Sequence, residues 1–242
     1  MIKPIIKSLI YWCSYVFERN HYSKIIYYHD VGKRFTDMGT DLDLIRSHFD
    51  IVRNCGYHFV DEIINLDGEI MVCFDDGWAG IYDSRDFFIE QNIHPTIFIA
   101  VELIGKPGYL TLDQIRELQD MGFLFEGHTW THNDLTTFDD DDLWHEVKDS
   151  KDELSRHLGK EITAICFPKG RFSDKVYEAC IKVGYEKLYA SISGSYFDQF
   201  EDKKVICRNL VQSANQNDFK HILNSTSRIM KSRSVKLHYQ LS

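Results

Sequence analysis

Short apolar runs alternate along the chain with longer stretches in which apolar residues recur every three or four positions. Runs rich in Ile, Val, Phe and Tyr are typical of buried strands, and the wider spacing is typical of amphipathic helices. The alternation of the two predicts strand–helix units around a parallel sheet. The predicted strands are residues 24–29, 57–60, 69–74, 95–100, 123–127, 162–167, 186–191 and 205–208.

Helices are predicted between these strands, at residues 41–55, 81–91, 112–121, 140–158, 174–183 and 218–230. Thr111 and Ser173 stand where an N-cap hydroxyl is expected. This number of strands and helices in 242 residues favours an α/β fold of the (β/α) barrel type, with seven or eight strands, over an open sheet. No linker, low-complexity stretch or internal repeat divides residues 24–231, so we expect one barrel domain there.

The two ends of the chain depart from this pattern. Lys3 and Lys7 precede an apolar, aromatic run at residues 9–17, which is shorter than the ~20 residues that span a bilayer. No small-residue cleavage site follows the run, which argues against a secretory signal. We expect residues 1–23 to form a helical segment that docks on the barrel or contacts a membrane surface. The polar tail at residues 232–242 is expected to be loosely ordered.

Composition narrows the classes of function. The chain is 43% hydrophobic and 27% charged, which is enough apolar material for a full core. Its 28 Lys and Arg against 37 Asp and Glu give a net charge of −9, which argues against a nucleic acid partner. Its six cysteines form no C-x-x-C pair and are predicted to be reduced. We therefore expect a cytoplasmic location, with association at the inner membrane surface as an alternative.

Polar side chains follow four of the predicted strands, at residues 28–30, 73–77, 126–132 and 166–170. In (β/α) barrels the carboxyl ends of the strands meet at one rim, and catalytic side chains lie at that rim. The sequence therefore predicts one functional site that draws on all four segments.

The strand at residues 69–74 leads into Asp75, Asp76 and Gly77. Neighbouring residues at a strand end point in different directions, so one carboxylate can bind a cation while the other stays free as a base. The alternative is a solvated Asp–Gly turn. Two unpaired anions directly after a buried strand are costly without a cation, which favours the site.

His128 and His132 have the spacing of a metal-binding pair. The Glu that zincins use as a base next to such a histidine is missing, so the base must come from Asp75 or Asp76. One carboxylate and two imidazoles leave positions on an ion for water and substrate, as in hydrolytic metal sites. We expect a divalent metal, Zn²⁺ first, with Co²⁺, Ni²⁺ or Mn²⁺ as alternatives.

Two of these motifs, FDDG at residues 74–77 and HTWTH at residues 128–132, resemble the first two motifs of the polysaccharide deacetylase family, the NodB-homology or carbohydrate esterase 4 enzymes. Residues 28–31, 49–57 and 167–170 are similar to the branch that contains the poly-N-acetylglucosamine deacetylases. The resemblance covers residues 25–208. It implies a distorted NodB-type barrel and a metal-dependent hydrolase that acts on N-acetylated saccharides.

The resemblance also implies roles for single residues. Asp75 would be the general base, and Asp76, His128 and His132 would be the metal ligands. The backbone N–H of Lys169 would help to hold the oxyanion of the reaction.

The third motif departs from the family pattern. Many members have Arg at the position of Cys166 and an aromatic residue after Pro168, where this chain has Lys169. The side chain that orients the base would then be missing or be supplied by Arg208.

The acid that protonates the leaving amine comes from a late Leu-x-His motif in the family, which has no counterpart here. His238 directly follows Leu237, and His221 lies in a predicted helix. We expect His29, at a strand end on the predicted rim, to be the acid. The alternative is an imidazole bonded to neighbouring backbone.

Aromatic side chains near the motifs offer flat faces for a sugar ring. We expect Trp78, Tyr109 and Trp130 to contact substrate, together with Pro168 and Arg208. For Trp130 the alternative is a brace for the loop that carries the two histidines.

The sequence thus predicts a metal-dependent N-deacetylase that hydrolyses the acetamide of an amino sugar to a free amine and acetate. A deformylase or other small-amide hydrolase on an amino sugar is an alternative, as is a non-catalytic carbohydrate-binding relative. The sequence leaves open the sugar, its chain length, the metal and the oligomeric state.

Overall fold

The computed structural model describes residues 4–32, 34–198, 200 and 203–240 of the chain. Its central sheet has the strand order β11-β10-β8-β7-β6-β5-β1-β12, and every pairing in it is parallel. The strands are β1 Lys24–Tyr28, β5 Glu69–Phe74, β6 Thr96–Ile99, β7 Leu124–Gly127, β8 Ala164–Cys166, β10 Lys187–Ala190, β11 Val205–Cys207 and β12 Asn209–Leu210. The short strand β4, His58–Phe59, pairs with β5 beside this path.

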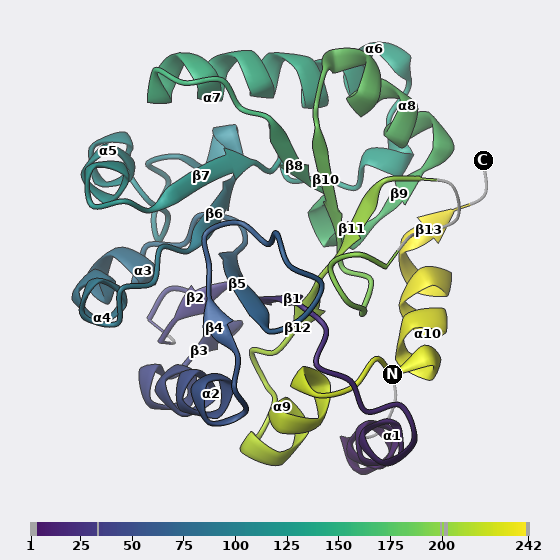
Figure 1. Ribbon diagram of the computed structural model, residues 1–242. Helices are drawn as coiled ribbons and strands as arrows, with labels where there is room; N and C mark the ends of the chain where they lie inside the picture. Colours follow the sequence, from purple (N-terminus) through teal and green to yellow (C-terminus); the bar gives the residue numbers. More distant parts are fainter. Residues whose placement is uncertain (1–3, 33, 199, 201–202, 241–242) are drawn as a thin grey trace.

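The sheet closes through a single stretch of chain. β11 and β12 are separated only by Arg208, yet β11 pairs with β10 and β12 pairs with β1. The two ends of the strand order are therefore one interrupted strand, and the sheet is a barrel with helices around its outside (Figure 1). The prediction of a (β/α) barrel with seven or eight strands is confirmed, the number depending on whether β11 and β12 are counted together.

Alternate side chains of the strands fill two different spaces. One set, which includes Ile25, Tyr27, Cys73 and Phe98, forms one apolar cluster, and the neighbouring residues of the same strands pack in a larger cluster with the helices. Because both faces of each strand are covered, β1 and β5 are buried at every position. This explains why the strands read as continuous apolar runs in the sequence.

The helices around the barrel lie close to their predicted positions, but two of the predicted helices are interrupted. The observed helices are α2 Leu42–Asn54, α3 Gly80–Asp83, α4 Arg85–Glu90, α5 Leu112–Asp120, α6 Asp140–Trp144, α7 Ser150–Leu158 and α8 Asp174–Val183. The helix predicted at residues 81–91 is divided into α3 and α4 at Ser84. A π-helical turn, η3 His145–Asp149, joins α6 to α7 inside the predicted helix 140–158. Thr111 and Ser173 cap α5 and α8, as predicted.

Short elements lie between these helices and the strands. They are β2 Asp30–Val31, β3 Gly39–Thr40, η1 Val101–Leu103, η2 Leu135–Thr137, η4 Pro168–Gly170, β9 Phe172–Ser173 and β13 Tyr239–Gln240.

The prediction for the last part of the chain is wrong. A single helix was expected at residues 218–230 and a loose tail at 232–242, but the structure has α9, Gln216–Leu223, and α10, Arg228–His238. The polar residues 224–227 end the first helix, and the Ser227 hydroxyl caps the second by accepting a hydrogen bond from the N–H of Met230. α10 is held because Met230 and Val235 pack on the core. Residues 241–242 lie outside the described part.

The segment before the barrel forms a docked helix, α1, Pro4–Phe17. It packs against α9 and α10, with Tyr11 buried and the Ser8 hydroxyl donating a hydrogen bond to Asp218 Oδ2 at 2.8 Å. Leu9, Trp12 and Phe17 are exposed on its other side. In the described residues no helix has the length and apolarity needed to cross a bilayer. Contact with a membrane surface stays a prediction, and residues 1–3 lie outside the described part.

Barrel closure generates a stability prediction at Asn209, which is buried on β12. Its side-chain N–H groups donate to the carbonyl oxygens of Ile25 and Gly194 at 3.1 and 2.8 Å, and its Oδ1 accepts from the N–H of Gly194 at 3.2 Å. Replacement by alanine leaves these buried backbone groups without partners. Asn209→Ala should lower the free energy of unfolding by about 1–3 kcal/mol, measured by urea denaturation.

Asn54→Ala is the matched control, because Asn54 is exposed near the end of α2 and should change stability by less than about 0.5 kcal/mol. Equal stability of the Asn209 variant and the native chain would contradict a role for this residue in closing the barrel.

Candidate active site

Asp75 and Asp76 leave β5 in different directions. The Asp75 N–H still continues the sheet by donating to the Tyr28 carbonyl at 3.0 Å, whereas Asp76 and Gly77 adopt left-handed backbone conformations with φ of 73° and 78°. At Gly77 a side chain would be strained by the positive φ, and its Cβ would lie 2.7 Å from Ile99 Cδ1, so glycine is favoured. The turn sends two neighbouring carboxylates, both buried, to different partners.

The Asp76 carboxylate meets the two histidines. Its Oδ1 lies 3.3 Å from His128 Nε2 and 2.9 Å from His132 Nε2. This oxygen is buried and receives no well-directed hydrogen bond from a described residue, although two imidazoles face it. One ligand atom from each of the three residues lies within 4.8 Å of the other two. The three side chains predicted as metal ligands are therefore brought together.

The proton on His128 is fixed by its surroundings. His128 Nδ1 lies 2.7 Å from the carbonyl oxygen of Cys166, which can only accept a hydrogen bond. Nδ1 therefore carries the proton, and Nε2 presents a lone pair to the space it shares with Asp76 and His132. A carboxylate oxygen and imidazole nitrogens are ligands that suit a divalent ion such as Zn²⁺, so the residues present fit the predicted metal.

The acid–base properties of this group follow from its burial and charges. Burial alone would raise the pKa of Asp76, but the two imidazoles outweigh it and hold the pKa well below its usual range. Burial would lower the pKa of His132, but Asp76 outweighs it and raises this pKa. The cluster thus stabilises an ionised carboxylate between two nitrogen ligands.

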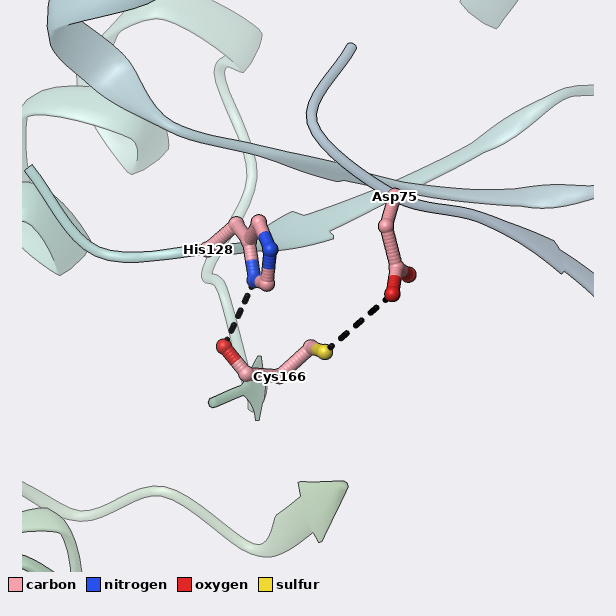
Figure 2. A group of neighbouring side chains, drawn as sticks. All are labelled: Asp75, His128 and Cys166. Atoms are coloured by element: carbon pink, nitrogen blue, oxygen red, sulfur yellow. Dashed lines mark hydrogen bonds between the residues drawn. The ribbon is translucent and has the colours of Figure 1, made fainter. Parts of the chain in front are cut away.

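Asp75, His128 and Cys166 form a second group of possible ligands (Figure 2), which shares His128 with the first. Its sulfur is a poor ligand here, because burial raises the pKa of the Cys166 thiol well above its usual range. Both oxygens of Asp75 are also taken up by Arg208. Asp75 is therefore the carboxylate that a metal in the first group would leave free.

Arg208 holds Asp75 in a two-point contact. Nη1 donates to Asp75 Oδ1 at 2.7 Å, and Nη2 donates to Oδ2 at 2.9 Å and to Cys166 Sγ at 2.8 Å. Burial by itself raises the pKa of Asp75, but Arg208 outweighs this effect and lowers the pKa. The guanidinium thereby keeps Asp75 ionised and fixes its orientation.

The expectation that Arg208 contacts substrate is corrected by this geometry. Its side chain is 0% exposed and lies behind Asp75 in the barrel interior. The other expectation, that it orients the base in place of the Arg that the family has at Cys166, agrees with the contacts.

His29 lies at the end of β1, on the same rim. Its Nδ1 is 2.5 Å from Gln212 Oε1, so its partner is a side chain and not the neighbouring backbone. Since Oε1 accepts, Nδ1 carries a proton and Nε2 is available. His29 also lowers the pKa of Asp75 by its charge, which places the ring near the predicted base. Its role as the acid stays a prediction.

Pro168 and Lys169 lie in η4. Pro168 is buried, and Lys169 is exposed with a left-handed backbone, φ 57°. The charge of Lys169 acts on the pKa of His132, which places Lys169 near the metal ligands. The third motif is thus at the site, and the role of the Lys169 N–H stays a prediction.

Trp78 and Tyr109 form an aromatic pair beside the ligands. Their rings stack with centroids 4.1 Å apart, and the Trp78 indole N–H donates to Asp76 Oδ2 at 3.0 Å. Burial, followed by the charge of Asp76, raises the pKa of Tyr109. Both residues are half-buried. The pair can therefore orient the Asp76 carboxylate and still present a ring edge to a sugar.

Trp130 lies in the loop from His128 to His132, which we call the histidine loop, and its ring faces the π-helical turn η3. It packs on the core, with its ring 4.8 Å from that of His145. This arrangement supports the brace that was raised as the alternative, and contact with substrate stays a prediction.

Glu146 was missed by the sequence analysis. It is buried in the π-helical turn, where Oε2 accepts hydrogen bonds from the N–H groups of Trp130 and Thr131, both at 3.0 Å, and Oε1 accepts from the Thr131 hydroxyl at 2.6 Å. A carboxylate thus holds the loop between His128 and His132 from behind. In the sequence, Glu146 could have been noticed as an acidic residue on the apolar side of a predicted helix. The spacing of residues along that helix does not show that its carboxylate reaches the loop between His128 and His132.

Strained backbone is concentrated at this site. Five described residues other than glycine have positive φ, and four of them are Asp76, Thr129, His132 and Lys169. Such conformations cost ~1–3 kcal/mol each and persist only where the surroundings impose them. Their position indicates that the loops are shaped to bring the side chains together.

Comparisons with known proteins find similar sequences among proteins named as deacetylases. The Bacillus subtilis (strain 168) protein named "Putative polysaccharide deacetylase YxkH" is 29% identical over 118 residues, 48% of this chain and 42% of its own length. The peptidoglycan-N-acetylmuramic acid deacetylase PdaA of the same organism is 25% identical over 130 residues, 51% of this chain and 47% of its own. The alignments thus span less than half of these curated relatives.

The fold is also that of solved deacetylases. The structure of the Streptococcus pyogenes deacetylase PplD, in complex with acetate, superposes with a TM-score of 0.71 at 21% identity and covers 84% of this chain and 98% of that one.

The sequence pattern that defines the polysaccharide deacetylase family matches residues 65–188, just over half of the chain, including Asp75, Asp76, His128 and His132. The chain belongs to the polysaccharide deacetylase family.

Proposed function

We propose that this chain is a metal-dependent N-deacetylase that hydrolyses the acetamide of an N-acetylated amino sugar to a free amine and acetate. The observation that carries the proposal is that the two carboxylates that follow β5, Asp75 and Asp76, have different partners. Asp76 faces two imidazole nitrogens, while Asp75 is bound to Arg208 and remains free of them. A ligand group and an ionised base thus lie side by side. The deacetylase relatives support the substrate class.

Asp76, His128 and His132 would hold the ion, which supplies a Lewis acid that polarises the amide carbonyl and acidifies water. Asp75 accepts the proton of the attacking water, because Arg208 keeps its carboxylate ionised and aimed. The buried position of both groups excludes competing solvent and strengthens their charges.

Two further groups act on the amide itself. The N–H of Lys169 would donate to the oxygen that becomes negative when the C–O bond forms. His29, in its charged form, would give its Nε2 proton to the nitrogen as the C–N bond breaks, and Gln212 keeps the ring in the orientation that this requires. The products are acetate and the amine. Pairing of Arg208 with Asp75 argues against the non-catalytic alternative, because Arg208 substitutes for the Arg that is missing at Cys166.

The first test separates the base from the ligands. Asp75→Asn should keep about one metal ion per chain but release acetate ~10²–10⁴-fold more slowly, because it removes the general base and leaves the three metal ligands in place. His128→Ala should lose both metal and activity. The measurement is elemental analysis together with an acetate assay over a panel of N-acetylated saccharides.

His157→Ala, a partly buried histidine on α7, is the control and should keep both properties. Undiminished acetate release by Asp75→Asn would refute the proposed base. Formate in place of acetate, from N-formylated sugars, would favour the deformylase.

The second test concerns Glu146. Glu146→Ala should weaken metal affinity ~10–100-fold, because the backbone of the histidine loop loses its acceptor and the ligands lose their fixed orientation. Competition with a metal chelator measures this affinity. Glu153→Ala on α7 is the control, and the same affinity in both variants would rule out the brace.

The third test concerns Arg208 as a positioning residue. Arg208→Met leaves a buried carboxylate unpaired, so we expect kcat to fall with little change in KM and stability to fall by about 3–5 kcal/mol. In an Asp75→Asn background the same substitution should cost much less, because the charge is already gone. Arg208→Lys should restore part of kcat. Equal costs in both backgrounds, from urea denaturation, would show that Arg208 acts independently of Asp75.

A further inference from the structure

A pocket of about 330 Å³ adjoins the proposed active site. It begins at His29 and Lys169 on the barrel rim and continues between α1 and α10, which lie side by side in Figure 1. Its volume is at the lower end of the ~300–1,000 Å³ of small-molecule sites. Because it shares His29 and Lys169 with the proposed reaction centre, a sugar whose amide reacts there can place another substituent in the pocket.

The pocket is basic in an acidic protein. Lys7, Lys169 and Arg233 line it, and no Asp or Glu is among its lining residues, although the chain carries a net charge of −9. Among the described residues, no carboxylate forms an ion pair with any of these three cations. Cationic side chains that gather in a concave site without acidic partners favour an anionic ligand.

Polar groups that can complete such a site lie in the same pocket. Ser191, Ser193 and Ser234 line it with the cations. His238, at the end of α10, also lines it and lies near the backbone of Lys169, so the pocket wall adjoins the predicted oxyanion loop.

We propose that this basic pocket binds an anionic substituent of the amino sugar, a carboxylate or a phosphate, with Lys7 and Arg233 as its charged contacts. The preferred substrates are then negatively charged N-acetyl amino sugars. This inference rests on the proposed deacetylase function and assigns it a substrate class. It also gives α1 a function, since the helix supplies Lys7 to the site.

The experiment compares kcat/KM for three probes with the metal-replete full chain. They are N-acetylmuramic acid with a carboxylate, N-acetylglucosamine 1-phosphate with a phosphate, and neutral N-acetylglucosamine. We expect an anionic probe to be favoured ~10-fold or more, and the faster of the two identifies the preferred anion. The preference should shrink as salt rises, because these charges are partly open to solvent.

Arg233→Gln should lower the ratio of anionic to neutral kcat/KM ~10-fold, Lys7→Gln should lower it less, and Arg233→Lys should restore part of it. Lys236→Gln on the same helix is the matched control, because it changes the net charge equally but lies outside the pocket and should leave the ratio unchanged. Far-UV circular dichroism checks that each variant is folded.

Calorimetric binding of the same probes to Asp75→Asn separates the two proposals. Tighter binding of an anionic probe, lost in Asp75→Asn with Arg233→Gln, supports the basic pocket even if no probe is hydrolysed. Acetate release from all three probes at equal kcat/KM would overturn the pocket and leave the deacetylase standing. Neither binding nor acetate release with any probe would overturn both.

Discussion

The buried contact between Arg208 and Asp75 is the interaction on which the rest of the active centre depends. Arg208 is the one residue between β11 and β12, so the stretch that closes the barrel also delivers a guanidinium to its interior. There it lies over the rings of Tyr27 and Phe98, at 4.2 and 5.2 Å. A charge in such surroundings is stable only with a well-matched partner, and Asp75 supplies two oxygens. Closure of the fold and ionisation of the proposed base are therefore coupled.

This coupling explains how adjacent carboxylates come to differ. Asp75 is committed to Arg208 from one side, and the left-handed turn at Asp76 and Gly77 carries the next carboxylate toward His128 and His132. Glu146 holds the histidine loop from behind, and the Cys166 carbonyl orients His128. Each chemical group is thus positioned by a different element, and the strain in the loops is balanced by these contacts.

The sequence predicted the barrel because parallel strands buried on both faces leave continuous apolar runs that spacing can locate. The meeting of the strand ends also predicted a carboxylate of the Asp75–Asp76 pair beside His128 and His132, and the resemblance to the family assigned Asp76 as the ligand. The sequence did not separate α9 from α10. A short polar stretch ends α9, and the Ser227 hydroxyl caps the start of α10. Glu146 could not be found because its alignment with the histidine loop depends on a π-helical turn. The basic pocket could not be found either, because Lys7 and Arg233 come from helices far apart in the chain.

The pairing of α1 with α9 and α10 bears on the order in which the molecule can be made. The contact between Ser8 and Asp218 joins residues 210 positions apart, and closing so long a loop is an entropic cost that falls late in folding. Barrel closure carries a similar cost, because β12 pairs with β1 and joins Ile26 to Asn209. Arg208 lies in the closing stretch, so the guanidinium that fixes Asp75 and the helices that complete the basic pocket would both reach their places late. In the nascent chain, neither hydrolysis nor substrate selection would then precede the other.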